Sequence, residues 1–322
     1  MLLQPRLYVP FKSNILILAS SPVATQLSFG TQPSNANAYA SISPSITVEI
    51  KDSNGDVVTS DNSTQVTLSF DTNPPTGDLL GTLTKTAVNG VATFNDIAVD
   101  RWATGYKLAA NATGLTGAIS NTFDIAQVTW VYDTFTDTAG TNIQSHTPDT
   151  NVYGHSWAQS KSNGGTQSNT FVKIQTVDGN TRWQSSVDFY GSVIDIEHTD
   201  CEMEMKWKNI SGGAKRHGFI IRYASDGNEH EVQWRQDFTD VRLYPVVNGS
   251  QGTSQLIIGS HSTTTGNIYT IKIVVYKTEV KVYENGTLLG SGTLSLNPTS
   301  TKFGILRRAD VAWFDDLTIK SP

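Results

Sequence analysis

Residues 267–296 read NIYTIKIVVYKTEVKVYENGTLLGSGTLSL, and this stretch decides the fold class. Apolar residues occupy every second position over 271–275, and a second alternating run covers 280–283. Period-two alternation is typical of a strand with one buried face. The dipeptide Asn285-Gly286 follows the second run, and both residues can take the positive φ angles of a tight hairpin turn before the next strand at 287–293. The stretch therefore predicts a β-meander.

The composition of the whole chain supports the same fold class. At 322 residues the chain is long enough for about two domains of about 150 residues each. Charged residues make up only 16%, and no helical apolar period persists for ten residues. This balance is typical of extracellular β-modules and not of a cytosolic α/β enzyme. We therefore expect an all-β protein with little helix.

The distribution of charged and apolar residues limits the classes of partner that we expect. The net charge of −6 is spread along the chain, with 6 Lys/Arg against 9 Asp/Glu in residues 1–127 and 17 against 20 in the remainder. Because no basic face is evident, we expect no nucleic-acid partner. No apolar run approaches the roughly 18 residues of a membrane span, so we expect no membrane insertion.

Cys201 has no second cysteine to pair with and opens an alternating run to Trp207, which predicts a buried core thiol.

The first 22 residues can be interpreted in two ways. The short apolar run 14–19 and the tripeptide Pro22-Val23-Ala24 could form a signal peptide and its end, but Lys12 lies close before the run. Alternatively, three prolines keep residues 1–22 extended, and the apolar residues between them are available to add to the sheet edge of another protein. We treat residues 1–22 as an extended docking arm and leave the signal peptide open.

Residues 23–127 predict a first β-sandwich. Short alternating runs are separated by turn clusters about 8 to 12 residues apart, which is the spacing of a sandwich. Tyr106 follows Gly105 at the place where such a sandwich uses a tyrosine corner.

Several segments of this first domain carry a resemblance to a known family. Lys51-Asp52-Ser53-Asn54-Gly55, Asn89-Gly90-Val91-Ala92-Thr93-Phe94 and Gly105-Tyr106-Lys107-Leu108 together resemble the bacterial Ig-like repeats of invasin and intimin type adhesins. The resemblance implies an Ig-like fold and a spacer role, because such modules serve as spacers on bacterial surface proteins and on tailed-phage virions alike. The sequence has no second tandem copy, unlike the long adhesin arrays, and this favours a virion.

Residues 128–322 predict a second, larger sandwich. Roughly a dozen strands are expected here, more than one small sheet needs, so we expect two stacked antiparallel sheets in a jelly roll. The opening Asp133-Thr134-Phe135, the hairpin 283–286 and the final segment 313–319 resemble the concanavalin A-like lectin and laminin-G-like superfamily. Its members include lectins, glycoside hydrolases, carbohydrate-binding modules and inert structural domains, so the resemblance predicts a fold more sharply than a function.

The resemblance to this superfamily also implies one possible catalytic segment. Its retaining glycosidases carry a nucleophile, a helper Asp and an acid/base Glu at alternating positions of one strand, which correspond here to Val193, Asp195 and Glu197. A valine cannot attack an anomeric carbon, so we interpret Asp195 and Glu197 as an exposed strand face. No zinc-binding histidine spacing, nucleophile elbow or phosphate loop occurs elsewhere in the sequence. We therefore expect no catalytic residues and no enzyme activity.

A calcium site is the one metal site that the resemblance implies. Hard cations need several oxygen ligands, and members of the superfamily often join a carboxylate near the first strand to one near the last. Asp133 with Asp315 or Asp316 would supply that pair. The alternative is a structural aspartate at a strand end that accepts backbone N–H bonds.

Sugar binding normally needs an exposed aromatic platform with a few polar groups. Trp207, Trp234 and Trp313 lie inside alternating runs and are expected in the core. Tryptophans that flank the polar loop of the second domain are better candidates for exposure. The candidate glycan-binding residues are therefore Trp157, Trp183, Tyr153, Arg182 and Tyr190.

Together these features predict a non-enzymatic structural protein on the surface of a tailed-phage particle, as a decoration or fibre protein. We expect the arm 1–22 to dock on other virion proteins, the Ig-like domain 23–127 to act as a spacer, and the lectin-like domain 128–322 to hold weakly to host-surface glycans. We also expect the protein to be oligomeric in the assembly. Two alternatives stay open, a secreted bacterial surface adhesin and a glycoside hydrolase of the lectin-like superfamily.

Overall fold

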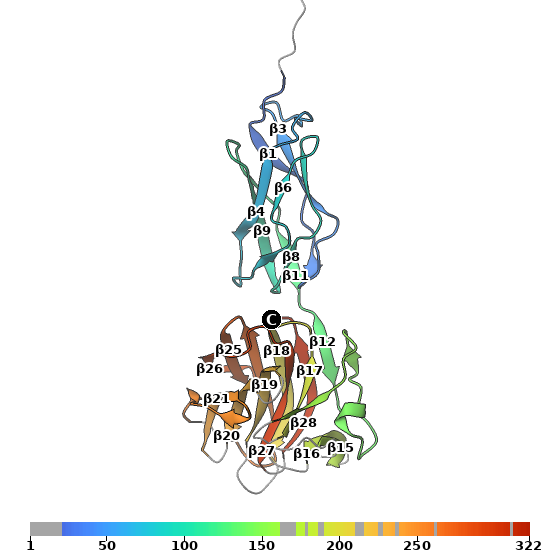
Figure 1. Ribbon diagram of the computed structural model, residues 1–322, viewed down its shortest axis with the longest axis vertical. Coiled ribbons are helices and arrows are strands. Elements are labelled where there is room, and N and C mark those ends of the chain that lie inside the picture. Colours follow the sequence, from blue (N-terminus) through green and yellow to red (C-terminus); the bar gives the residue numbers. More distant parts are fainter. Residues whose placement is uncertain are drawn as a thin grey trace, which may run out of the picture.

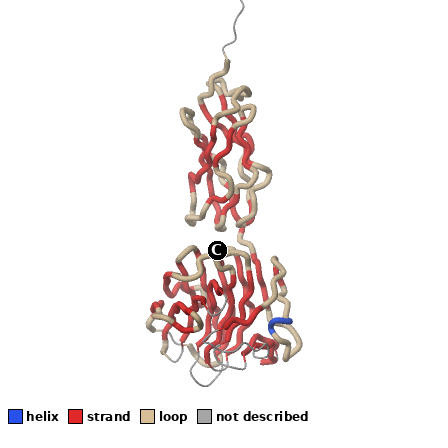
Figure 2. The backbone as a smooth tube through the Cα atoms, viewed as in Figure 1, coloured by secondary structure: helices blue, strands red, loops and turns tan. Residues whose placement is uncertain are grey.

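The computed structural model describes residues 21–161, 172–177, 180–185, 190–209, 216–224, 228–235, 238–260, 263–309 and 312–322. These residues form two β-sandwiches, and the described chain begins at the end of the N-terminal sandwich that lies away from the C-terminal one (Figure 1). The helical structure among them is one 3-10 turn, Ile143–Ser145 (Figure 2). No described helix has the length and apolar character of a membrane span. The prediction of an all-β fold is confirmed, while residues 1–20 of the expected arm lie outside the described residues.

The N-terminal sandwich packs two sheets on one apolar core. Buried and partly exposed residues alternate along its strands, as in β3, where Ile46, Val48 and Ile50 are fully buried. Both sheets therefore turn one face toward a shared cluster of apolar side chains. One sheet has the order β1 (Gln26–Thr31), β3 (Ile46–Lys51), β7 (Val91–Phe94), and the other has β2 (Ala36–Asn37), β11 (Phe123–Ala126), β9 (Ala103–Asn111), β4 (Gln65–Thr72), β6 (Thr84–Thr86), with β10 (Ala118–Ile119) beside β9 and a separate pair of β5 (Leu79–Leu80) and β8 (Ala98–Val99).

The expected tyrosine corner is present at the start of β9. Tyr106 is fully buried, and its hydroxyl donates a hydrogen bond to the backbone carbonyl of Arg101 at 2.8 Å. The bond ties β9 to the turn that carries Asp100, Arg101 and Trp102. This turn lies at the end of the sandwich that contacts the C-terminal domain, since Asp100 accepts a hydrogen bond from Tyr276.

The C-terminal sandwich consists of a nine-stranded and an eight-stranded sheet. Its strands are antiparallel to their neighbours, and the first and last strands of the domain, β12 and β28, pair directly. The nine-stranded sheet has the order β13 (Thr150–Asn151), β12 (Thr129–Asp133), β28 (Ala312–Lys320), β18 (Cys201–Asn209), β24 (Ile268–Tyr276), β25 (Glu279–Glu284), β26 (Thr287–Thr293). In addition, β16 (Asn180–Ser185) pairs with β28, and β15 (Val172–Val177) pairs with β16. The other has β14 (Ala158–Lys161), β17 (Tyr190–Asp195), β27 (Lys302–Ala309), β19 (Arg216–Ala224), β20 (Asn228–Arg235), β21 (Asp240–Val247), β22 (Ser250–Gln251), with β23 (Gln255–Ile258) on β21.

The meander and core that the sequence predicts are confirmed in this domain. β24, β25 and β26 pair in succession, and both residues of the turn, Asn285 and Gly286, have positive φ. On β18, Cys201 and Trp207 are fully buried at the two ends of the predicted alternating run. They face the same apolar cluster as Trp234 of the opposite sheet. Period two along each strand therefore decides which side chains fill the space between the sheets.

Polar and aromatic contacts join the two sandwiches. The Tyr276 hydroxyl donates to Asp100 Oδ2 at 3.1 Å, and the next residue, Lys277, pairs with Asp78 Oδ1 at 2.9 Å. Elsewhere in the junction, the Tyr39 ring of the N-terminal sandwich packs against rings of the C-terminal one. Residues from both domains therefore lie side by side at the junction.

The tyrosine corner generates a stability prediction. Tyr106→Phe removes the buried donor to the Arg101 carbonyl, so the N-terminal sandwich should lose about 1–2 kcal/mol of unfolding free energy. Urea unfolding followed by hydrogen exchange of the β4 and β9 amides measures this loss. Tyr132→Phe, a partly buried tyrosine on β12 of the other domain, serves as the control. An unfolding free energy that is equal in both variants would contradict a stabilising corner.

Candidate functional site

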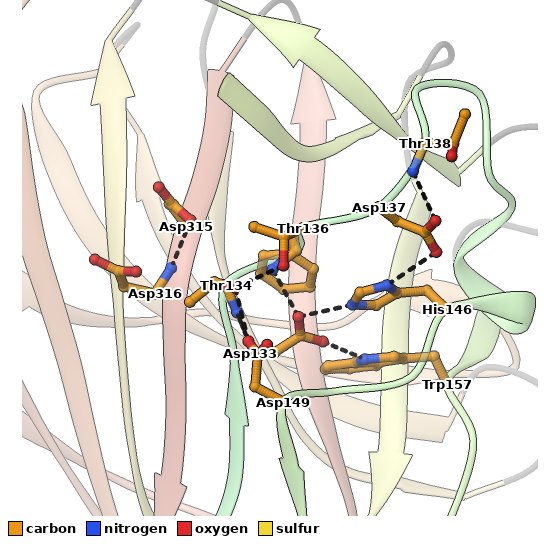
Figure 3. A network of polar contacts seen from close by, with 11 residues as sticks. Asp133, Thr134, Thr136, Asp137, Thr138, His146, Asp149, Trp157, Asp315 and Asp316 are labelled. Carbon is orange, nitrogen blue, oxygen red and sulfur yellow. Dashed lines mark hydrogen bonds and ion pairs between the residues drawn. The ribbon is translucent and has the colours of Figure 1, made fainter. Parts of the chain in front are cut away.

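Trp157 lies inside the C-terminal sandwich and is not an exposed platform. The residue is only 2% exposed, and its Nε1–H donates to Asp133 Oδ2 at 2.8 Å (Figure 3). A buried indole needs a partner for its N–H, and the buried carboxylate supplies one. The expectation that Trp157 is exposed because it flanks a polar loop is therefore wrong.

Asp133 forms the centre of this buried polar network. Its Oδ1 accepts a hydrogen bond from the Phe135 backbone N–H at 2.7 Å and contacts His146 Nε2 at 2.8 Å, while Oδ2 accepts from Trp157. Asp133 is fully buried, so these N–H groups replace the water that the carboxylate loses. The structural interpretation of this aspartate, a strand-end carboxylate that accepts N–H bonds, is the one observed.

The expected calcium pair is not brought together. Asp315 and Asp316 lie on β28, and in Figure 3 their carboxylates do not point toward Asp133. Asp316 instead pairs with Lys206 Nζ at 2.5 Å. Within the described ranges, no group of three or more His, Cys, Asp or Glu side chains is placed to hold a metal. Both Asp133 carboxylate oxygens already accept hydrogen bonds from N–H groups, so the carboxylate has a structural role.

The other four predicted glycan residues divide into two groups. Trp183 and Arg182 lie on β16 and Tyr190 begins β17, but their side chains lie outside the described part of the chain. Their glycan contacts therefore stay predictions. Tyr153 is partly buried at the domain junction, where its hydroxyl lies 2.7 Å from His198 Nε2. It shares no site with the buried Trp157.

Val193, Asp195 and Glu197, the positions with the glycosidase resemblance, do not all lie on one strand. Val193 on β17 is buried, and the strand ends at Asp195. The Asp195 carboxylate accepts bonds from the Glu197 backbone N–H at 3.0 Å and from Thr301 Oγ1 at 2.7 Å. Glu197 lies beyond the strand at positive φ. The expectation that Asp195 and Glu197 share an exposed strand face is wrong, because the chain turns between them.

An exposed tryptophan that the sequence did not single out lies at the domain junction. Trp102, in the turn before β9, is 47% exposed and lines a cleft of about 410 Å³. The N-terminal sandwich also contributes Arg101 to this Trp102 cleft, and the outer face of the nine-stranded sheet contributes Lys272 and Tyr283. Lys272 Nζ lies 4.8 Å from the centroid of the Tyr283 ring. The cleft thus combines two aromatic side chains with charged hydrogen-bonding groups.

A second junction cleft, of about 420 Å³, is lined by aromatic residues that contact one another. The His198 imidazole lies between Tyr39 and Trp130, with ring centroids at 4.2 and 4.3 Å. Burial lowers the pKa of His198, and its Nε2 lies 2.7 Å from the Tyr153 hydroxyl. Because these ring faces already contact one another, the Trp102 cleft is the better candidate for a ligand.

No protein-family model matches this chain, and no curated protein does. Solved structures are similar over about half of it. A Bacillus subtilis carbohydrate-binding module, CBM66, shares 14% identity over 52% of this chain and 95% of its own (TM-score 0.39), and sheep galectin-11 shares 13% over 42% and 99% (0.35). Domain 4 of AbnA, a Geobacillus stearothermophilus extracellular arabinanase, in complex with arabinotriose, shares 12% over 61% and 93% (0.39). At these scores the likeness says nothing about ligands, which must be inferred from the residues of this chain.

The Asp133 network generates a pH prediction. Burial lowers the pKa of His146, but the hydrogen bonds and charges of Asp133 and Asp137 outweigh it and raise the pKa above its usual 6.5. The stability that His146 contributes is therefore complete below about pH 6.5 and is lost as the pH rises through the raised value.

In the His146→Gln variant, the C-terminal sandwich should lose stability at about pH 6 and less at about pH 8, as measured by thermal unfolding at both pH values. His155→Gln removes an exposed pair with Glu197 and is the control, because exposed ion pairs contribute little. An equal loss at both pH values for His146→Gln would contradict a titrating network.

Proposed function

We propose that this protein is a non-catalytic glycan-binding protein that holds a saccharide in the Trp102 cleft. The observation that carries the proposal is the exposed indole of Trp102 in a cleft that also contains Tyr283. The flat faces of large aromatic side chains suit the apolar C–H face of a sugar ring. Lys272 and Glu202, paired at 3.4 Å beside them, can bond to sugar hydroxyls.

The same cleft supports binding more than hydrolysis. Glycoside hydrolysis requires two carboxyl groups on either side of the scissile bond. Among the described residues that line the Trp102 cleft, Glu202 is the one acidic side chain, and it is paired with Lys272. Of the other candidates, the Asp195 carboxylate accepts two hydrogen bonds in the turn after β17, and the Glu197 carboxylate pairs with His155. A passive binding role therefore fits the chemistry of these residues best.

The place of action that we propose is the surface of a tailed-phage particle, with the protein as a decoration or fibre subunit. The support is the module order in the sequence together with the direction of the chain. The described chain starts at the end of the N-terminal sandwich that lies away from the junction (Figure 1). Attachment through residues 1–22 would leave the Trp102 cleft accessible. Weak binding by one cleft would gain avidity from many copies on one particle.

Replacing the exposed tryptophan tests the binding role. In Trp102→Ala, saccharide binding on a glycan array and in titration calorimetry should fall by about tenfold or more, because an aromatic contact with a sugar ring is lost. Phe238→Ala is the matched control, since Phe238 is 55% exposed but does not line the cleft. Equal binding by the wild-type protein and Trp102→Ala, with the fold intact, would reject the cleft as the glycan site.

Deleting residues 1–22 tests the docking role. The truncated protein should fold, because the described core begins after this segment, but it should be absent from purified phage particles analysed by mass spectrometry. The full-length protein should be present in the same analysis. Incorporation of the truncated protein at the wild-type level would refute the docking arm, and absence of the full-length protein would refute the virion location itself.

A further inference from the structure

The Trp102 cleft carries positive charge in an acidic protein. Three of its lining residues, Arg101, Lys272 and Lys281, are cationic, and one, Glu202, is anionic. The chain as a whole has a net charge of −6. Positive charge in the cleft raises the local concentration of anions there and lowers that of cations, although the protein as a whole is negative. The cleft therefore favours a ligand with a negative group.

Arg101 is the cation best placed to receive that group. Its guanidinium lies over the Tyr276 ring at 4.2 Å, and its Nη1 donates to the Pro75 carbonyl at 3.0 Å. These contacts fix the plane of the side chain and leave its charge uncompensated, because Arg101 has no ion pair with a described carboxylate. Its Nε is buried without a hydrogen-bond partner among described residues. A fixed guanidinium of this kind suits the planar geometry of a carboxylate or sulfate.

The two lysines reach the cleft from the opposite domain. Lys281 on β25 is 43% exposed and makes only a loose, exposed pair with Glu279 at 3.6 Å. Lys272 on β24 is shared between Glu202 and the Tyr283 ring. The junction itself is held by other residues, Tyr276 with Asp100 and Lys277 with Asp78. The Trp102 backbone N–H donates to the Pro322 carbonyl across the junction at 3.4 Å, but its indole and the Lys281 ammonium make no described hydrogen bond or ion pair between the domains. A purely structural role therefore does not account for these two side chains.

We propose that the ligand is an acidic saccharide that bridges the two domains, and this inference rests on the glycan-binding function proposed above. Its sugar ring stacks on Trp102, and its carboxylate or sulfate is held by Arg101 of the N-terminal sandwich and by Lys272 and Lys281 of the C-terminal one. The N-terminal sandwich is then half of the binding site and not only a spacer.

The test uses the full-length chain and paired saccharide probes. Each pair contains an acidic oligosaccharide and its neutral counterpart, for example an oligogalacturonate and its methyl ester, or a sulfated oligosaccharide and its desulfated form, printed on one array. At least one acidic member should bind about tenfold more tightly than its neutral counterpart, and the difference should shrink as salt is raised. Binding confined to neutral members, or equal within pairs, would overturn the inference and leave the proposed function standing. No binding to any saccharide would overturn both.

Two variants assign the charge to the cleft. Lys281→Gln should weaken binding of the acidic member about fivefold more than binding of the neutral member, because it removes one charge and retains most of the side-chain volume. Lys302→Gln, an exposed lysine on β27 that does not line the cleft, is the matched control. Trp102→Ala should weaken both members of a pair. If Lys281→Gln and Lys302→Gln affect the acidic member equally, the preference comes from overall charge and the assigned site is wrong.

Discussion

The hydrogen bond from the Tyr276 hydroxyl to Asp100 is the contact on which the candidate site depends. Asp100 is buried, and burial raises the pKa of its carboxyl, although the Asp78 backbone N–H and the Tyr276 hydroxyl act in the opposite direction. The next two residues in the same turn are Arg101 and Trp102, which line the cleft. One turn therefore both contacts the neighbouring domain and presents the cation and the indole. The Tyr106 hydroxyl fixes this turn to the N-terminal sandwich by donating a hydrogen bond to the Arg101 carbonyl.

The Asp133 network shows a different use of polar atoms in the same protein. There, a carboxylate in the core satisfies the N–H groups of a tryptophan and a backbone turn and contacts a histidine. Such a group is expensive to leave unpaired, so its partners are fixed by the packing of the sandwich. At the junction, by contrast, Arg101 and Lys281 retain charge that the described residues do not fully neutralise. The difference between a structural and a binding role thus lies in whether the polar atoms are already satisfied.

The sandwich architecture of the C-terminal domain does not by itself decide its chemistry. Two stacked sheets provide strand ends, turns and outer faces on which many functions can be placed. In this chain the position of a glycosidase nucleophile is a buried valine, Val193, and the strand ends two residues later. A binding site at the junction between two domains does not require catalytic residues along one strand. It requires only that the adjoining ends of the two domains keep a fixed position relative to each other.

The sequence by itself determined the strands, the hairpin at Asn285-Gly286 and the buried positions of Cys201 and Trp207, because period-two alternation and turn chemistry act over a few neighbouring residues. It did not determine which tryptophan is exposed. Trp157 is covered because Asp133, 24 residues earlier, meets its N–H inside the sandwich, and Trp102 shares a cleft with Lys272 and Tyr283, which follow it by about 170 residues or more. Exposure and partnership of this kind depend on which distant surfaces come together, and only the packing of sheet on sheet and domain on domain decides that.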